Sequence, residues 1–337
     1  MNERIKVGVI GVGHLGQHHA RIYAALPEAE LVGIHDTHGE AAARVAQERN
    51  TRAFDSVEAL AAGCDALSVA TPTKHHFEIA RKLLEGGKHV LVEKPMTDNS
   101  PQAEELVRLA QARGLVLQAG HIERFNPVLK YLKSVAAEPR FIESHRLSPH
   151  PGRSVDIGVV LDLMIHDLDI ILDLVKSPLV SMDAVGVPVL STSEDIANVR
   201  LRFANGCVAN LTCSRVSAER MRKIRVFTTT SYISLDYMRQ EGQVYRVARA
   251  DEDVRESGLL AKLLAGAGMA GTVVSQFAGK TIIREPVPIE KDEPLKLELA
   301  SFVAAVRERR APVVTGEQAK RALDVALAIT EQIRKGK

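Results

Sequence analysis

The N-terminal segment constrains the fold most strongly, because a short apolar run leads directly into a glycine-rich turn. Residues 5–10 read Ile-Lys-Val-Gly-Val-Ile, a pattern typical of a buried strand. Gly11, Gly13 and Gly16 follow in a GxGxxG spacing, and a helical stretch begins at Gln17. In such a turn the first glycine permits the sharp bend, the second lets the backbone approach a pyrophosphate, and the third allows close helix–strand packing. The segment therefore predicts a dinucleotide cradle.

An acidic residue stands where the ribose of a dinucleotide is expected. Asp36 lies 20 residues past Gly16, at the end of a second predicted strand over 31–35. A carboxylate at this position binds a ribose 2′-hydroxyl and repels a 2′-phosphate, and Thr37 and His38 supply no arginine to hold one. We therefore expect NAD rather than NADP; the structural alternative is a glycine-rich turn with a surface aspartate. The expected cradle consists of Gly11, Gly13, His14, Leu15, Gly16 and Asp36.

Apolar runs and helical segments alternate through residues 1–120, which we assign to one domain. Further strands are expected at 66–70, 89–92 and 116–119, and helices at 17–25, 39–49, 76–85 and 101–112. Strands separated by helices indicate a parallel sheet with right-handed crossovers. Because ligands bind at the carboxyl ends of such strands, Thr71 and Pro72, which follow the third of these strands, are candidates for the cofactor crevice. Thr71 is explained equally well as part of the turn that begins the next helix.

The pattern changes after residue 120, and we assign residues 121–337 to a second domain. Several strands follow one another, which indicates a mainly antiparallel sheet. Asn205-Gly206 between two of them predicts a hairpin. A helix over 158–174 precedes most of the strands, segment 259–279 is either a short helix or an excursion, and two helices in 295–337 close the chain and can pack back on the first domain. The expected strands are 141–147, 180–190, 197–203, 207–214, 223–230 and 232–236.

Composition excludes several classes of function. The net charge of +2 argues against a nucleic-acid-binding protein. The three cysteines form no CxxC pair and no zinc spacing, which indicates a reducing compartment. No apolar run is long enough to span a bilayer, and residues 5–12 are too short for a signal peptide. We expect a cytoplasmic protein that contacts neither nucleic acid nor membrane.

Two apolar segments carry ionisable side chains, which are costly there unless they are paired or used. Lys94 follows the strand 89–92 and precedes Pro95, which restricts it to extended conformations. Asp162, His166 and Asp169 are spaced i, i+4 and i+7 in an otherwise apolar helix, so they share one face. Lysine, imidazole and carboxylate are the groups of a proton-transfer site.

Other readings of these residues exist. An isolated Glu93-Lys94 is usually a surface pair beside a turn, and a lone buried histidine is usually a satisfied core residue. A metal site of His166, Asp162 and Asp169 with His145 or His150 is also conceivable, but no compact zinc motif is present and a lysine is an unusual neighbour for a metal. We therefore expect no metal.

Together these motifs resemble the Gfo/Idh/MocA family of nicotinamide-dependent oxidoreductases over essentially the whole chain. The resemblance rests on the glycine turn, on Ala70-Thr71-Pro72 with His76, on the Gly87–Pro95 segment and on the Asp162–Asp169 helix. It implies a doubly wound Rossmann domain and a second α+β domain with an open-faced sheet, through which dimers or tetramers form. It also implies NAD-dependent oxidation of a sugar or cyclitol secondary alcohol.

The resemblance also implies roles for particular residues. Lys94 would be catalytic or orient the substrate, Asp162 would bind substrate hydroxyls and His166 would take the proton. Lys94 could instead share the base role if burial favours its neutral form, or stay charged and stabilise an alkoxide. Two departures from the family pattern are evident: Val159, Val160 and Met164 replace the usual glycines, and the Asn-Arg-Arg-Phe-like segment reads His121-Ile122-Glu123-Arg124-Phe125, which lacks the asparagine but keeps Arg124. The remaining cofactor contacts implied are Thr71, Pro72, His76, Glu93, Lys94 and Arg124.

Within the family, residues 120–127, 214–217 and 223–227 are similar to the branch that oxidises the 3-hydroxyl of UDP-N-acetylglucosamine in lipid A diaminosugar pathways. A diphosphate requires cations, and the candidates are Arg124, Arg146, Arg153 and Arg215. Each could instead be a surface or ion-pair residue. Two further hypotheses stay open: a free inositol or glucose dehydrogenase of the same family, and a non-enzymatic NAD-dependent sensor. The set of Lys94, Asp162 and His166 argues against the sensor.

Overall fold

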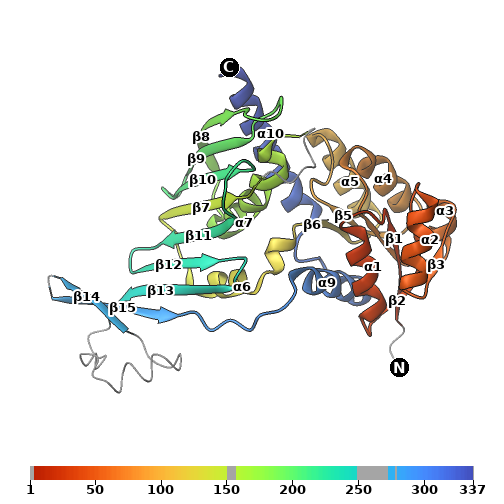
Figure 1. The fold of residues 1–337 in the computed structure, drawn as a ribbon, viewed down its shortest axis with the longest axis horizontal. Helices are drawn as coiled ribbons and strands as arrows, with labels where there is room; N and C mark the ends of the chain where they lie inside the picture. The colour runs from red at the N-terminus through yellow and green to blue at the C-terminus, as the bar shows by residue number, and fades with distance from the viewer. Residues whose placement is uncertain (1–3, 150–156, 249–271, 278, 337) are drawn as a thin grey trace. The chain divides into compact units, whose positions relative to one another are not determined.

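The computed structural model describes residues 4–149, 157–248, 272–277 and 279–336. The chain forms two compact units: Met1–Phe125 with Asp292–Leu327, and Asn126–Lys291 with Ala328–Lys337. Figure 1 shows helices α9 (Pro294–Glu308) and α10 (Gly316–Lys335) in blue at the end of the chain. All of α9 and most of α10 belong to the first unit, so that unit combines the N-terminal part of the sequence with the segment Asp292–Leu327.

The first unit is built on a parallel sheet of six described strands, as the sequence predicts. The strand order is β3-β2-β1-β4-β5-β6. The order in which successive strands are added reverses between β1 and β4, which pair in parallel, and doubly wound folds bind dinucleotides at this switch point. Short β3 and α3 were not predicted. The strands are β1 (Ile5–Ile10), β2 (Ala29–His35), β3 (Arg52–Ala53), β4 (Ala66–Val69), β5 (His89–Glu93) and β6 (Leu117–Gly120); the helices are α1 (Gly16–Ala25), α2 (Gly39–Glu48), α3 (Val57–Ala62), α4 (His76–Glu85) and α5 (Ser100–Ala112).

The core of this unit joins distant parts of the sequence. Val7 and Val9 of β1 pack in one buried cluster with Tyr23 of α1 and with Leu299 and Phe302 of α9. Both Leu299 and Phe302 are fully buried. Burying side chains of this size contributes about 1.5–3 kcal/mol each, so α9 is an integral layer of the first unit.

The second unit is built on a nine-stranded sheet of the described chain, ordered β14-β15-β13-β12-β11-β7-β10-β9-β8. Only β7 and β10 pair in parallel; the other pairs are antiparallel, as predicted. The hairpin predicted at Asn205-Gly206 is confirmed, with Gly206 at φ +82. The strands are β7 (Phe141–Leu147), β8 (Leu179–Val187), β9 (Ile196–Phe203), β10 (Val208–Ser214), β11 (Met221–Phe227), β12 (Ser231–Asp236), β13 (Glu241–Val247), β14 (Thr272–Phe277) and β15 (Lys280–Pro286).

Three of these strands, β13 to β15, were not predicted. Segment 259–279 was left undecided between a helix and an excursion; its residues 272–277 form β14, whereas 259–271 and 278 lie outside the described residues. Short half-exposed strands of this kind carry a weak periodic signal, because only one of their faces is buried.

The two faces of the large sheet differ. Ile142, Ser144 and Arg146 of β7 are buried on the face that packs against helices, while Glu143 and His145 alternate onto the other face. The helical face carries α6 (Pro127–Val135), α7 (Ile165–Val175) and the end of α10, whose Ile333 packs against Gly186. The opposite face bears a row of ring contacts through Phe141, Phe227, Tyr232 and Tyr245. None of the described helices is both long and apolar enough to cross a bilayer.

Candidate active site

The glycine turn has the geometry that its sequence predicts. Gly11 has φ +83, and its N–H donates to the carbonyl oxygen of His35 at 2.8 Å. A Cβ on Gly16 would lie 1.8 Å from the Gly11 carbonyl oxygen, so only glycine allows α1 to begin this close to β1. These contacts fix the turn and aim the N-terminus of α1 at the end of the sheet, where its N–H groups favour an anion.

The turn also leaves room for a ligand. Gly13 is exposed, and a Cβ there would meet no atom within 4 Å. His14 beside it is exposed and Leu15 is half-buried. Thr71, at the end of β4, has a buried side-chain oxygen with no hydrogen-bond partner among the described residues. Open space over Gly13 and an unused buried hydroxyl across the β1–β4 crevice fit a dinucleotide lying over the turn.

Asp36 lies beside the same turn. Its Oδ2 accepts from the N–H of Val12 at 2.7 Å, and its Oδ1 accepts from the N–H of His38 at 2.8 Å. Burial raises the pKa of Asp36, but the hydrogen bonds from His38 and Val12 outweigh it and lower the pKa below its ordinary value. The carboxylate is therefore ionised at neutral pH and lies directly beside the glycine turn.

Lys94 sits on a turn that follows β5. It is half-buried, and the peptide bond between Lys94 and Pro95 is cis. Glu93 is buried below it: Oε1 lies 3.0 Å from Nε2 of His19 in α1, and Oε2 accepts from the N–H of Lys94 at 3.3 Å. The predicted cofactor contact at Glu93 remains untested. In this structure its carboxylate is directed into the protein interior.

His76 links two loops of the first unit. Its Nδ1 lies 2.9 Å from the carbonyl oxygen of Pro95, and its Nε2 lies 2.7 Å from that of Thr71. Burial lowers the pKa of His76, and the two carbonyl groups oppose that shift. Because both ring nitrogens contact backbone atoms, His76 tethers the Thr71-Pro72 segment to the Lys94 turn.

The predicted polar face lies at the start of α7 in the second unit. We expected one α-helix over 158–174; the structure instead has a π-helical turn, η3 (Val160–Met164), followed by α7. Asp162 is on the π turn and half-buried, His166 is on α7 and 9% exposed, and Asp169 is buried. Single π turns occur often at functional sites.

The start of this helix is held by Glu194, which lies in the loop before β9. Glu194 accepts from the N–H of Val159 through its carbonyl oxygen at 3.0 Å and from the N–H of Val160 through Oε1 at 3.4 Å. A Cβ on Gly158 would lie 1.9 Å from the Glu194 carboxylate. A carboxylate from a distant loop therefore holds the beginning of this helix, which local sequence cannot reveal.

Arg146, a candidate for diphosphate binding, is 3% exposed and pairs with Asp167 of α7. Its Nε donates to Oδ2 at 2.7 Å and its Nη2 to Oδ1 at 3.2 Å. This two-point buried ion pair ties α7 to β7. The contact favours the ion-pair reading of Arg146, which then fixes the helix that carries His166.

Arg215 follows β10 and is fully buried. It donates to Asp195 at 2.7 Å, to the carbonyl oxygen of Ile157 at 2.7 Å and to Ser191 at 2.9 Å. Asp195 also accepts from the N–H groups of residues 189–191. With its guanidinium enclosed in this way, Arg215 is an ion-pair residue in this structure, and the expectation of direct substrate contact is revised.

Two arginine candidates remain, Arg124 and Arg153. Arg124, on the 3-10 turn η2 (Ile122–Phe125), is 7% exposed and donates to the carbonyl oxygen of Val313 at 3.4 Å. Arg153 and His150 lie outside the described residues.

The described residues contain no group of three or more His, Cys, Asp or Glu side chains placed to hold a metal ion. The alternative that combined His145 with His166 has a geometric obstacle. Arg146 points to α7, so its neighbour His145 lies on the opposite face of the sheet and lines a hollow of about 360 Å³ there, with Glu143 and Arg200.

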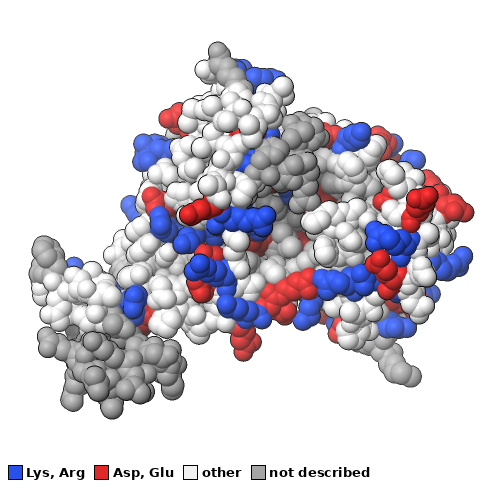
Figure 2. Space-filling view, viewed as in Figure 1, with Lys and Arg blue, Asp and Glu red and all other residues white. Residues whose placement is uncertain are grey.

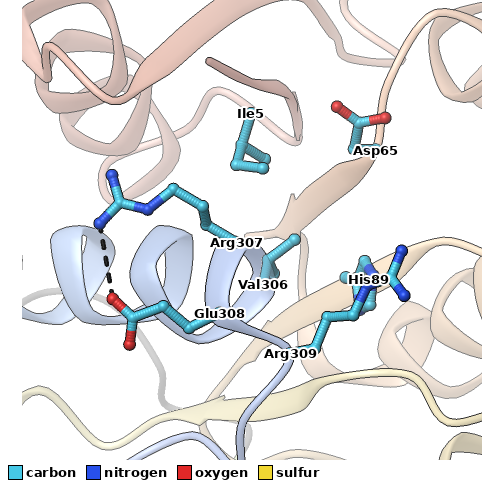
Figure 3. Close-up of a pocket in the computed structure, with 7 residues that line it drawn as sticks. All are labelled: Ile5, Asp65, His89, Val306, Arg307, Glu308 and Arg309. Atoms are coloured by element: carbon cyan, nitrogen blue, oxygen red, sulfur yellow. Dashed lines mark hydrogen bonds and ion pairs between the residues drawn. The ribbon is translucent and has the colours of Figure 1, made fainter. Parts of the chain in front are cut away.

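One cavity of about 560 Å³ lies away from the glycine turn. Figure 3 shows Arg309, just after α9, reaching toward His89 at the start of β5, while Arg307 is directed toward Glu308; Asp65, just before β4, also lines the cavity. Ligands of parallel sheets bind at the other, carboxyl, ends of the strands. Acidic and basic side chains also intermingle over the surface visible in Figure 2, so charge alone marks no site on it.

Family models match both parts of the chain. Residues 5–121 match the model described as "Oxidoreductase family, NAD-binding Rossmann fold", and residues 136–234 match the "GFO/IDH/MocA C-terminal domain". UDP-N-acetylglucosamine 3-dehydrogenase of Acidithiobacillus ferrooxidans is 38% identical over 96% of this chain and 96% of its own length. The chain belongs to the Gfo/Idh/MocA family. It is thus an NAD-dependent oxidoreductase.

A solved structure and one more curated relative also match the chain over nearly its full length. The solved structure of UDP-N-acetylglucosamine 3-dehydrogenase GnnA from Acidithiobacillus ferrooxidans superimposes with a TM-score of 0.85, at 36% identity and over 98% of each chain. The scyllo-inositol 2-dehydrogenase (NAD(+)) of Bacillus subtilis strain 168 is 25% identical, over 100% of this chain and 96% of its own. The resemblance inferred from motifs is confirmed along the full length.

Sequence reasoning missed several buried polar residues around these sites. His19, Asp167, Glu194 and Asp195 were not singled out, although all are buried and hydrogen-bonded. For His19 a signal existed, because it shares an inward helical stripe with Ile22 and Tyr23. The other three are recognisable only by partners distant in the sequence.

Proposed function

We propose that the protein oxidises the 3-hydroxyl of UDP-N-acetylglucosamine to the 3-keto sugar, with NAD as hydride acceptor. The observation that carries this proposal is the 38% identity to a UDP-N-acetylglucosamine 3-dehydrogenase over 96% of both chains. A relative that matches end to end at this level makes the same substrate class the first hypothesis, whereas a shared fold alone does not fix a substrate.

The first unit would supply the cofactor site. Gly11, Gly13 and Gly16 would hold the pyrophosphate, Asp36 the ribose hydroxyls, and Thr71 the edge of the crevice. Bound NAD supplies a hydride acceptor. The residues of the chain would then have to receive the proton that the substrate hydroxyl loses as the ketone forms.

Lys94, His166 and Asp162 would handle the hydroxyl. His166 would accept the proton, since an imidazole can do so near neutral pH. Asp162 would orient the sugar hydroxyls, and the Lys94 ammonium would stabilise the developing alkoxide. Arg124 and Arg153 remain candidates for the diphosphate, whereas Arg146 and Arg215 would act through the elements that they hold in place.

The test is NADH formation by the purified protein with NAD and UDP-N-acetylglucosamine, measured by absorbance beside myo-inositol, scyllo-inositol and glucose. A parallel reaction should contain an aminotransferase and an amino donor, which draw off the ketone. We expect NADH only with the UDP-sugar. Turnover of a free polyol would replace the proposed substrate, and no turnover with NAD still bound would favour the sensor.

Asp36 gives a separate test of cofactor choice. Replacing Asp36 with asparagine should weaken NAD binding roughly 10-fold, because a hydrogen bond to a charged acceptor contributes about 1.5–3 kcal/mol. The same change should strengthen NADP binding, since the repulsion of the 2′-phosphate is removed. Isothermal titration calorimetry with each cofactor would measure the two dissociation constants and their ratio. An unchanged preference for NAD would mean that residues other than Asp36 discriminate between NAD and NADP.

We also propose a homodimer or homotetramer formed through the open face of the large sheet. The ring row of Phe141, Phe227, Tyr232 and Tyr245 and the exposed Val185 support it, because aromatic and apolar groups are enriched in interface cores. We propose a cytoplasmic location and a role in lipid A biosynthesis, with the 3-keto sugar passed to an amino-transfer reaction. The domain division at residue 120 also remains a prediction.

A further inference from the structure

We propose that two buried histidines, His19 and His76, are positioning residues that hold the Lys94 turn from two sides. The inference rests on the proposed role of Lys94. The proposal does not require either histidine to contact the substrate. His19 acts through the Glu93 carboxylate and His76 through the Pro95 carbonyl oxygen, and both of these residues are neighbours of Lys94 in the chain.

The first support acts through Glu93. His19 is fully buried in α1, and its Nε2 lies 3.0 Å from Oε1 of Glu93. The other carboxylate oxygen of Glu93 accepts from the backbone N–H of Lys94. His19 therefore orients the acceptor that fixes the Lys94 backbone.

The protein is built around this carboxylate. A Cβ on Gly120 of β6 would lie 2.7 Å from the Glu93 carboxyl group, so the neighbouring strand carries no side chain there. Nearby, Tyr23 of α1 contacts Ser68 of β4 at 2.8 Å, which ties the same helix to the sheet. Burying a carboxylate is costly unless it is partnered. Helix α1 and strand β6 therefore hold it in one orientation.

The second support acts through Pro95. Nδ1 of His76 lies 2.9 Å from the Pro95 carbonyl oxygen, just after Lys94, and Nε2 lies 2.7 Å from the Thr71 carbonyl oxygen. His76 is the first residue of α4 and is 1% exposed. The two nitrogens thus serve different loops, one with the lysine and one with the cofactor crevice.

This geometry allows the two functions of His76 to be separated by substitution. An asparagine amide can reach the position of Nδ1, and a glutamine amide can reach that of Nε2. H76N then keeps an amide that can donate to the Pro95 carbonyl oxygen and loses the contact with Thr71, whereas H76Q keeps the contact with Thr71 and loses the one with Pro95. A displacement of about 1 Å at a reacting group can lower turnover by roughly 100-fold.

The experiment compares H76N, H76Q, H19A and H19Q with the wild type, measuring kcat with UDP-N-acetylglucosamine and the NAD dissociation constant by isothermal titration calorimetry. We expect H76Q to lower kcat by about 10- to 100-fold with little change in NAD affinity. H76N should chiefly weaken NAD binding. H19A should lower kcat, and H19Q, which restores a donor to Glu93, should recover most of it. H89N is the control, because His89 begins β5, the strand that ends at Glu93.

Equal effects of H76N and H76Q on both parameters would overturn the proposal, as would a full kcat in H19A. If H19A fails to fold, the two His76 variants decide. A substrate-free readout separates this proposal from the proposed function: the rate of reductive methylation of Lys94 in the NAD complex, with exposed Lys130 as internal reference. A wild-type protein that is inactive on the UDP-sugar would reject the proposed function. A rate of Lys94 methylation that is unchanged in H76Q and H19A would reject the positioning role of the two histidines.

Discussion

Replacing Lys94 or His166 with alanine is expected to lower kcat by about 100- to 10,000-fold, the range that general acid–base groups contribute. The NAD dissociation constant should change little, because the glycine turn and Asp36 belong to other segments of the first unit. Initial rates with UDP-N-acetylglucosamine and a separate cofactor titration measure the two quantities.

Two further substitutions distinguish the chemical roles. Lys94→Arg keeps a positive charge but cannot act as a base at neutral pH. Substantial activity in this variant would mean that Lys94 stabilises an alkoxide, and activity as low as in Lys94→Ala would favour proton transfer or strict positioning. His166→Asn keeps a polar side chain without a proton acceptor. We expect it to lose the acidic limb of the kcat/KM profile.

Near-normal turnover in both Lys94→Ala and His166→Ala would reject the assignment of these residues. Leu163, between Asp162 and His166 in sequence and half-buried, provides a matched control. Leu163→Met conserves volume, so its effect on kcat should be small.

Removing Arg215 is expected to destabilise the second unit by about 3–5 kcal/mol, because it leaves a buried carboxylate without its cation. Arg215 and Asp195 are both fully buried, and their ion pair links β10 to the loop before β9. Urea unfolding of Arg215→Met, followed by circular dichroism, measures the loss. Arg220, exposed a few residues further on, is the control; Arg220→Met should change stability by no more than about 0.5 kcal/mol.

A double-variant cycle tests whether the effect belongs to the pair. The double variant Arg215→Met, Asp195→Asn leaves no buried charge of the pair unpaired. Its loss in free energy of unfolding should therefore be smaller than the sum of the losses in the two single variants. Additive losses would mean that the two residues act independently.

The pair also predicts a dependence of stability on pH. Burial raises the pKa of Asp195, but hydrogen bonds from residues 189–191 and from Arg215 outweigh it, so the folded-state pKa lies below the ordinary value. A carboxyl with a lowered folded pKa stabilises the protein above its unfolded pKa of about 3.9, and this contribution is lost as pH falls towards the folded pKa. The stability difference between wild type and Asp195→Asn should therefore shrink below about pH 4.

The sheet of the first unit and the glycine turn could be predicted because their signals are local. The run from Ile5 to Ile10 is apolar as a parallel strand must be, and Gly11 and Gly16 are required by sterics within a few residues. Asp36 could be placed because strand β2 ends just before it. The hairpin at Asn205-Gly206 was equally local.

The tertiary structure alone decided what the buried charges do. Arg146 and Arg215 were predicted as candidates for a diphosphate, and the fold pairs them with Asp167 and Asp195, about 20 residues away in the sequence. Glu93 meets His19 across 74 residues. Sequence shows that a charged side chain occurs in an apolar setting, where it must be paired or used. Which of the two applies depends on chain crossings that bring distant segments together, and neither periodicity nor turn chemistry encodes those.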